Sequence, residues 1–441
     1  MANMGSCYAF LVFIGCCSLS AGGFALVYDL AGVYLLPVAN SLGLSSADVS
    51  LWLAADGTMA LVAMPLAGHL LRKNNMHHFM TMGAFSTAAG VFGFRFCTAP
   101  YHFIICGCLT GFGMPYLYGI AEVTLISNWF CIRKQGRFLG IAMACQGIAG
   151  AIWAPLFTHI VQSIGYQHAY TINAVMILAM TLPWTLFVFR RDPQQMGLLP
   201  YGVGSQKMET NVEETDAFIG VDYRSALKKG GFWIALVASC TVCIGMGFEN
   251  HQQAIAIEFL GEIGVNPASA TIAGGYMMSC FGIGTVLGDL LFGMMLDKIP
   301  MRAVYFGFLA VFMGAFALWY IFQTVYVVLL LGSLMLGTHN GLASVGYPML
   351  IRRLFGGLDY SRIYALVNMV CAFFGGYTTT IISLLYEEVG RSYAHVMPFA
   401  IAVVAVLMVL SQIAISLVGH YRWHDREGNL VDAFRDNNRI R

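Results

Sequence analysis

Five acidic side chains lie inside stretches of sequence that are otherwise apolar: Asp29, Asp56, Glu122, Glu249 and Asp289. An unpaired charge at the centre of a membrane helix costs about 2.5–3.5 kcal/mol even on the most lenient insertion scale. These groups therefore cannot face lipid, and each must line a water-filled path, face other helices or hold a proton. A buried carboxyl group that gains and loses a proton is suited to proton or cation coupling. We expect this chemistry above all of Asp29, Glu249 and Asp289.

Two of these acids also have a structural interpretation. Asp56 could accept a hydrogen bond from a neighbouring helix, and Glu122 could pair with Arg133 or Arg137 of the basic segment that follows it. Both remain candidates for coupling. Glu122 shares a helical face with small and polar residues, as Asp29 does. The two stripes are Gly111, Pro115, Tyr118 and Glu122 on one segment, and Ser18, Gly22, Ala25 and Asp29 on the other.

Polar and aromatic residues of the same segments form a candidate solute cavity. No lysine lies at the centre of an apolar stretch, so the cavity is acidic on balance. A cavity of this sign attracts cations or protons and repels carboxylates unless its acids are neutralised. The two histidines in the set could equally be buried structural residues. The candidate cavity residues are Tyr116, Tyr118, Gln146, Trp153, Asn250, His251, Tyr276, His339 and Asn340.

The 12 cysteines lie mostly inside apolar runs, where we expect them to act as small packing residues. Cys240-x-x-Cys243 has no second pair that would complete a four-ligand zinc site, so the sequence predicts no metal and no cofactor. It contains no G-x-x-x-x-G-K-[ST] motif, which argues against ATP as the driving force within this chain. No nucleophile, base and orienting acid occur together, and we do not expect an enzyme.

Apolar runs long enough to cross a bilayer recur along almost the whole chain. The 441 residues are 58% hydrophobic and only 10% charged, against roughly 25% charged in soluble proteins. The net charge of +1 gives no reason to expect a nucleic-acid partner. Only helices of this kind satisfy their own backbone hydrogen bonds in lipid. We therefore predict an all-α integral membrane protein with transmembrane helices at 8–38, 46–70, 76–98, 101–129, 137–163, 167–189, 230–258, 267–295, 302–322, 325–350, 361–386 and 393–419.

The basic residues give the orientation of these helices. All Lys and Arg residues except Arg95 and Arg391 lie in alternate connections or in the C-terminal tail. Because basic residues gather on the cytoplasmic side of a membrane, both termini are predicted to be cytoplasmic. A long polar loop divides the chain into a six-helix half at 1–190, the cytoplasmic loop at 191–229, a second six-helix half at 230–419 and a cytoplasmic tail at 420–441.

Landmarks recur between the two halves at a nearly constant offset. Gly43 corresponds to Gly264 in similar sequence, and Gly68 corresponds to Gly293. Equal spacing of such landmarks indicates two parallel structural repeats around a shared central cavity.

The loop after Gly293 carries the pattern G-x-x-x-D-[KR], completed by Asp297 and Lys298. An apolar helix that ends in this pattern resembles the loop between the second and third helices of each half of a major facilitator superfamily transporter. In the first half the matching residues are Gly68 and Arg72, so arginine replaces the acid. The resemblance covers essentially the whole chain. It implies twelve helices in two six-helix pseudo-repeats, with Gly68, Arg72, Gly293 and Asp297 in conformational loops.

Within the superfamily, the sequence is similar to the monocarboxylate and oxalate/formate porters, chiefly over 128–136 and 190–202. Porters of that branch often carry an Asp-x-x-x-Arg pair in helix eight, and the oxalate type carries a lysine in helix eleven. Here helix eight has Thr285 and Asp289 at those positions, and 363–383 contains no lysine. The basic residues that would bind a carboxylate are therefore absent.

These observations predict a secondary transporter that moves a small organic solute by alternating access. We expect coupling to protons or a monovalent cation, and a monomer in a bacterial cytoplasmic (inner) membrane. The acidic cavity favours a cationic or zwitterionic solute. Two alternatives remain open. The family resemblance implies a proton-coupled organic-anion porter or exchanger, and a protein of another class would be a membrane sensor that binds a solute without moving it.

Overall fold

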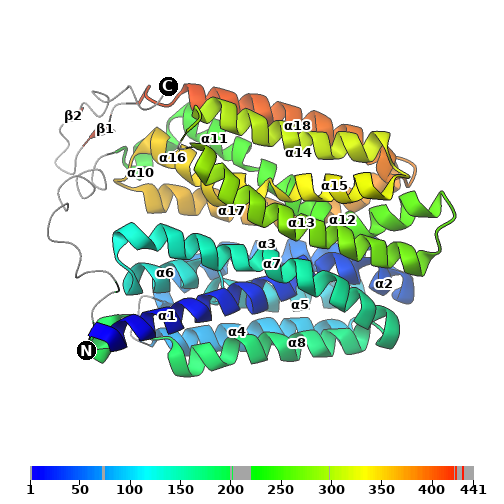
Figure 1. Ribbon diagram of the computed structural model, residues 1–441, viewed down its shortest axis with the longest axis horizontal. Helices are drawn as coiled ribbons and strands as arrows, with labels where there is room; N and C mark the ends of the chain where they lie inside the picture. Colours follow the sequence, from blue (N-terminus) through cyan, green and yellow to red (C-terminus); the bar gives the residue numbers. More distant parts are fainter. Residues whose placement is uncertain are drawn as a thin grey trace.

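The computed structural model describes residues 2–71, 75–198, 201, 220–296, 298–421, 423–424 and 430–431. Nearly all of them are helical, and two bundles of helices lie side by side with their helices along the long axis of the molecule (Figure 1). The predicted all-α membrane fold is confirmed.

The first bundle holds the helices that precede the central loop. Its opening span is interrupted, because a π-helical stretch, η1, joins two α-helices. A second helix begins at a capping box in which Ser45 and Asp48 bond each other's backbone amides. The elements are α1 (Ala2–Leu19), η1 (Ser20–Asp29), α2 (Ala31–Leu42), α3 (Ser46–Leu70), α4 (Met76–Gly93), η2 (Phe94–Phe96), α5 (Pro100–Gly113), η3 (Met114–Tyr116), α6 (Ile120–Trp129), α7 (Ile132–Ile164), α8 (Tyr166–Pro183), η4 (Trp184–Val188) and η5 (Pro193–Met196).

The second bundle follows the central loop and repeats the interrupted opening span, here as α11 and α12. Its third-to-last span is also interrupted by a π-helical stretch, η7. The elements are α10 (Tyr223–Leu227), α11 (Gly230–Ser239), α12 (Thr241–Gly261), α13 (Pro267–Leu296), α14 (Met301–Ile321), α15 (Tyr326–Gly337), η7 (Leu342–Gly346), α16 (Tyr347–Phe355), α17 (Tyr360–Glu388) and α18 (Tyr393–Ser416). Two short strands, β1 (Trp423–His424) and β2 (Leu430–Val431), pair antiparallel in the tail.

Eleven helices in the described part of the chain are long and apolar enough to cross a membrane, one fewer than the twelve predicted. The difference is the segment predicted at 76–98. It forms α4, which is 18 residues long and carries His77 and His78 in its first turn. The helix packs against α5 and α8 within the first bundle, and Figure 1 shows it running beside α8.

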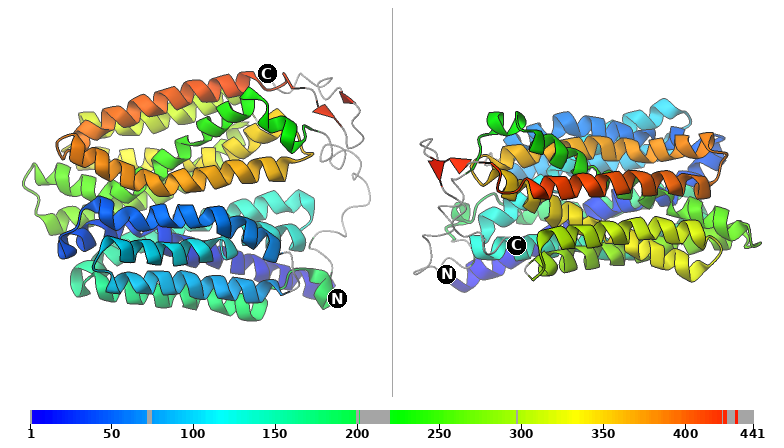
Figure 2. Two further views of the ribbon diagram at one scale, coloured as in Figure 1. Left: turned by 180° about the vertical axis from the view of Figure 1, so that it is seen from behind. Right: turned by 90° about the horizontal axis from the view of Figure 1, so that it is seen from above.

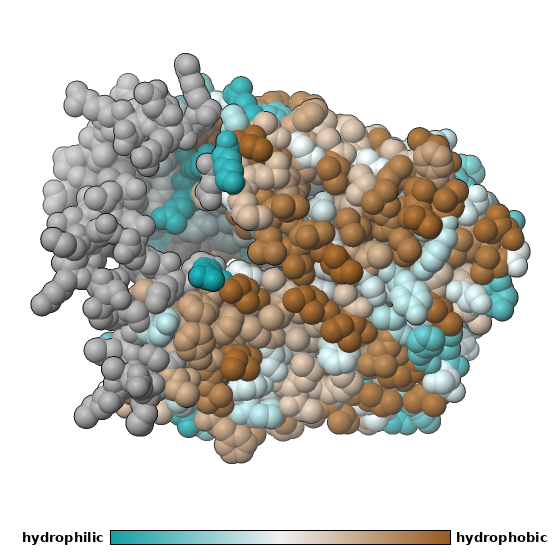
Figure 3. All heavy atoms as spheres, viewed as in Figure 1, coloured by the Kyte–Doolittle hydropathy of each residue, from teal (hydrophilic) through white to brown (hydrophobic). Residues whose placement is uncertain are grey.

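Each bundle has its own apolar core. Trp129 and Phe103 are fully buried in the first, and Trp319 and Tyr305 are fully buried in the second. On the outside, apolar side chains cover the middle of the face in Figure 3, as expected of a surface that meets lipid.

The two bundles meet along three helix pairs: α3 with α17, α7 with α13, and α2 with α12. Small residues allow these close approaches. A Cβ atom on Gly57 would lie 2.8 Å from the carbonyl oxygen of Ala372, and one on Gly147 would lie 2.7 Å from that of Gly282.

The start of α1 and the end of α18 lie at the same end of the molecule, in different bundles, as Figures 1 and 2 show. On the face in Figure 3, the surface is hollowed between the bundles at this end. The bundles are joined at the opposite end. There the Ser50 and Thr380 hydroxyls are 2.8 Å apart, and Gln162 Nε2 donates to the Ala268 carbonyl at 2.9 Å. The space between the bundles is therefore closed away from the termini.

Candidate functional site

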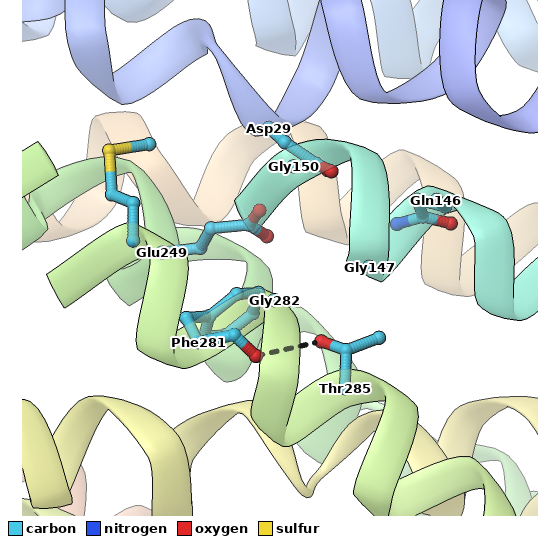
Figure 4. Close-up of a pocket in the computed structure, with 9 residues that line it drawn as sticks. Asp29, Gln146, Gly147, Gly150, Glu249, Phe281, Gly282 and Thr285 are labelled. Atoms are coloured by element: carbon cyan, nitrogen blue, oxygen red, sulfur yellow. Dashed lines mark hydrogen bonds between the residues drawn. The ribbon is translucent and has the colours of Figure 1, made fainter. Parts of the chain in front are cut away.

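A small polar cavity lies between the two bundles, and both contribute to it (Figure 4). Its free space, about 10 Å³, corresponds to roughly one water molecule. None of the described residues that line it is Lys or Arg. The lining consists of Asp29 from η1; Gln146, Gly147 and Gly150 from α7; Glu249 from α12; and Met278, Phe281, Gly282 and Thr285 from α13.

Asp29 is the last residue of the π-helical stretch η1, directly before α2 resumes the α-helical pattern. Such interruptions are frequent at functional sites because they change which side chains point inward. Asp29 is buried, and Gly150 of α7 lies against it. A Cβ atom at position 150 would lie 3.0 Å from Asp29 Cγ and closer still to Oδ2. Glycine at this position therefore makes room for the carboxyl group.

Glu249 comes from the other bundle and reaches the same space. Figure 4 shows its carboxyl group directed towards Asp29 and Gly150. The two acids line the same space, and Asp29 Oδ1 is buried without a hydrogen-bond partner among the described residues. Two negative charges so close together in a buried space repel each other, and binding of a proton by either group relieves the repulsion. The geometry thus brings one acid from each bundle together.

Gln146 links this pair to an aromatic side chain. Tyr118 donates its hydroxyl hydrogen to Gln146 Oε1 at 2.9 Å, and its ring packs against Phe24 with centroids 4.2 Å apart. Two of the predicted cavity residues, Tyr118 and Gln146, therefore lie together beside the acid pair.

Asp289 lies one helical turn beyond Thr285, on the side of the cavity towards the chain ends. Ser344 Oγ donates to its Oδ1 at 2.6 Å, and Asn340 Nδ2 lies 3.2 and 3.3 Å from its two oxygens. All the described donors are neutral, so Asp289 is held in place without a counter-charge.

Asp56 and Glu122 have partners inside the first bundle. Tyr28 donates to Asp56 Oδ2 at 2.8 Å, and Ser20 donates to Glu122 Oε1 at 2.7 Å. In each carboxyl group the second oxygen is buried without a partner among the described residues. The hydrogen bond from Tyr28 agrees with the structural alternative for Asp56. The described partner of Glu122 is a hydroxyl group, and the side chain of Arg133 lies outside the described residues.

Comparison with known proteins decides the family. The profile of a family described as Major Facilitator Superfamily matches residues 11–250, which is more than half of the chain. The chain belongs to this superfamily.

Curated relatives of the superfamily are similar to parts of the chain. MFS-type transporter 1 of Ophiocordyceps sp. (strain BCC 1869) is 24% identical over 63% of this chain and 56% of its own length. The putative glycerol-3-phosphate transporter 1 of Arabidopsis thaliana is 26% identical over 55% and 49%. The sialic acid transporter NanX of Escherichia coli (strain K12) is 22% identical over 56% of each. The chain thus spans about half the length of these relatives.

Two solved structures show the same fold. A bacterial homologue of the human lysosomal transporter Spinster has a TM-score of 0.68 at 13% identity, covering 93% of this chain and 98% of its own. The nucleoside transporter NupG has a TM-score of 0.70 at 15% identity, covering 91% and 99%. Superfamily membership and these relatives point to a transporter and not to an enzyme.

Three polar residues predicted for the superfamily's central cavity are instead bonded within the second bundle. His251 contacts the Tyr393 hydroxyl at 2.8 Å and the Thr379 carbonyl at 3.1 Å. Asn250 donates to Thr379 Oγ1 at 3.0 Å, and His339 contacts the Leu336 carbonyl at 2.8 Å. All three are buried outside the cavity lining.

The predicted aromatic residues are dispersed. Tyr116 is fully buried in the core of the first bundle, and 48% of Tyr276 is exposed. Trp153 donates to the Ala21 carbonyl at 3.0 Å and so ties α7 to η1. Asn340 lies beside Asp289 and not in the lining of the cavity.

Of the predicted loop residues, Gly68 and Gly293 are described, and each has open space where a Cβ atom would lie. Close packing therefore does not require glycine there. Arg72 and Asp297 lie outside the described residues.

Sequence reasoning did not find Gly150 and Ser344 as partners of the acids. Ser344 follows Asn340 by four residues, which is the helical spacing that brings two side chains to one face. That signal was readable in the sequence. The contact of Gly150 with Asp29 joins two distant segments, and no local pattern reports it.

Proposed function

We propose that this protein is a secondary transporter that moves a small organic solute by alternating access and couples the movement to protons. One observation carries the proposal: Asp29 of the first bundle and Glu249 of the second line one cavity. A pair that spans the two halves is made or broken when the halves rock against each other.

The pair supplies a route for coupling. While the two carboxyl groups are in contact they hold a proton between them. When the bundles move apart, each acid meets its own surroundings, and the proton can leave towards the side that has opened. Asp289 lies between the cavity and the end that carries the termini, and it is the next acid that a departing proton would reach.

The charge of the cavity supports a cationic or zwitterionic solute. Its described lining contains two acids, an amide and a hydroxyl group, and no basic side chain. Two carboxyl groups that share one proton keep one negative charge, which would attract an ammonium group, whereas a carboxylate would be repelled. With space for only about one water, the cavity admits a solute only after the halves have separated further.

A proton-coupled organic-anion porter is the second candidate. It is favoured by the names of two relatives, which are given as a glycerol-3-phosphate and a sialic acid transporter, and by the resemblance to monocarboxylate and oxalate/formate porters. In that case both acids would have to be protonated when the anion binds. The absence of Arg and Lys from the lining makes this the weaker proposal.

A monomer in a bacterial cytoplasmic membrane, with both termini inside, completes the proposal. Both halves of the site belong to one chain, so no second copy is needed to build it. The hollow at the end with the termini then opens to the cytoplasm, and the contacts of Ser50 with Thr380 close the outer side.

Uptake by proteoliposomes tests the proposal. The panel consists of an amine, a betaine and a monocarboxylate of similar size, each with and without an inwardly directed proton gradient. We expect gradient-stimulated uptake of the amine or the betaine, and none of the monocarboxylate. Stimulated uptake of the monocarboxylate alone would select the anion porter, and saturable binding without flux of any solute would select a sensor.

A further inference from the structure

Three cysteine side chains meet in the second bundle, outside the described lining of the cavity. The sulfur atoms of Cys240, Cys243 and Cys371 all lie within 4.8 Å of one another. Cys240 occupies the break between α11 and α12, Cys243 lies in the first turn of α12, and Cys371 comes from α17. The Cys240-x-x-Cys243 pair, which lacks a partner pair in the sequence, therefore gains its third thiol from another helix.

Local contacts hold the cluster together. The Cys243 thiol is buried and donates to the backbone carbonyl of Cys371 at 3.3 Å, which ties α12 to α17. The Cys240 thiol contacts the Leu236 carbonyl one turn earlier at 3.6 Å. Cys240 and Cys371 are half-buried.

The spacing suits one three-coordinate centre. Bonds of about 2.3 Å from a central atom to sulfur place three sulfur atoms roughly 4 Å apart. The observed limit of 4.8 Å therefore requires only a small contraction. Among the described residues, no His, Asp, Glu or fourth Cys belongs to the group, so a tetrahedral all-protein zinc site is not formed.

Charge decides which thiophilic element fits. Three thiolates around a divalent ion leave a net charge of −1, and around a monovalent ion −2. An uncompensated charge within the membrane is costly. Helices α11, α12 and α17 contain one basic residue, Arg362, which lies in the first turn of α17, more than two turns before Cys371. A trivalent centre with three thiolates is neutral and needs no counter-charge.

We propose that Cys240, Cys243 and Cys371 form a binding site for trivalent arsenic or a metalloid of the same class, held as a neutral three-thiolate adduct. The reaction is As(OH)₃ + 3 RSH → As(SR)₃ + 3 H₂O: three As–O bonds are replaced by three As–S bonds, and the thiol protons leave in the three water molecules. Nothing is oxidised or reduced. The adduct links the start of α12, the helix that carries Glu249, to α17.

Other thiols in the chain provide an internal comparison. Cys97 and Cys106 have their sulfur atoms 3.8 Å apart. A pair supplies only two As–S bonds and leaves one hydroxyl group on arsenic. The number of water molecules lost thus distinguishes the three-thiol site from the pair.

The test uses the full-length protein in detergent, incubated with arsenite under reducing conditions that leave the thiols free, and then passed through a desalting column. Intact-mass measurement should find one arsenic bound with the loss of three waters, and the adduct should raise the melting temperature. Cys371→Ser should lose this species and the thermal shift, and so should Cys240→Ser. The matched control Cys280→Ser, a half-buried thiol outside the cluster, should behave like the parent.

The proposal is overturned if Cys371→Ser retains the three-water species, or if the parent binds arsenic only with a remaining hydroxyl group. A poorly folded variant does not obscure the result, because the bond count of the parent protein is itself a test. A loss of at least tenfold in the affinity for arsenite in a normally folded Cys240→Ser variant also supports the site, because one of the three As–S bonds is then lost.

Discussion

Gly150→Ala tests the link between the packing of α7 and the acid pair. The new methyl group would lie 3.0 Å from Asp29 Cγ and 3.2 Å from its Cβ, whereas ordinary contacts are 3.4–4 Å. The three nearest atoms all belong to Asp29, so its carboxyl group must move by about 1 Å. A displacement of this size at a reacting group can lower a rate by about 10²-fold.

The stability of the variant should change little. Overpacking costs roughly 1–3 kcal/mol, and alanine in a helix recovers about 0.5–1 kcal/mol relative to glycine. We therefore expect folded protein whose proton-driven uptake is reduced by about 10–100-fold, with solute exchange at equal pH reduced much less.

Gly140→Ala is the matched control in this assay. It makes the same change in the same helix, where nothing lies within 4 Å of the added methyl group. Uptake in Gly140→Ala should equal that of the parent. If Gly150→Ala also keeps full proton-driven uptake, the position of the Asp29 carboxyl group does not control coupling, and the reasoning is refuted.

Three further predictions concern acids outside the pair. Asp289→Asn should abolish proton-driven uptake in liposomes and leave exchange partly intact, because driven uptake needs a group that carries the proton and exchange does not. Full uptake would exclude this acid from coupling. Ser20→Ala removes the described partner of Glu122 and should destabilise the protein by about 1–3 kcal/mol, measured as a lower melting temperature; an unchanged value would show that another group satisfies the carboxyl. The Asp222 side chain caps α10 by accepting a hydrogen bond from the Ser225 amide. Hydrogen bonds from the Ser225 side chain and, to a lesser extent, from this amide lower the pKa of the Asp222 carboxyl group. A carboxyl group whose pKa is lower in the folded state stabilises that state above the ordinary pKa of Asp, and this stabilisation is lost as the pH falls through the folded-state pKa. Hydrogen exchange at the Ser225 amide should therefore quicken on acidification, and Asp222→Asn should remove that pH dependence.

The fold was predictable because local sequence composition is its main determinant. A run of about 20 apolar residues must be a membrane helix, and both the interrupted first spans and the ends of α13 and α17 fall close to the predicted boundaries. The exception is α4. Two histidines in its first turn shorten its apolar part, and the prediction did not take this into account.

The site was predictable in part. Charge burial alone marks Asp29 and Glu249, since either would be costly in lipid. Whether they meet depends on which faces of η1 and α12 approach each other. Helical spacing shows which residues share a face, but it does not show what that face contacts. For the same reason, the sequence did not show that Cys371 lies beside the Cys240-x-x-Cys243 pair. His251 shows the reverse case, because it contacts Tyr393 of α18 whereas Gln253, two residues away, donates to Thr158 of α7.

In the proposed mechanism, Asp29 and Glu249 carry the coupled proton. A recording of the pH inside proteoliposomes, while solute is added outside with no gradient imposed, tests this role. We expect acidification of the lumen by the parent protein, and solute entry without acidification in Glu249→Gln, which keeps the shape of the side chain and removes its acidity. Acidification in Glu249→Gln at the rate of the parent would contradict it.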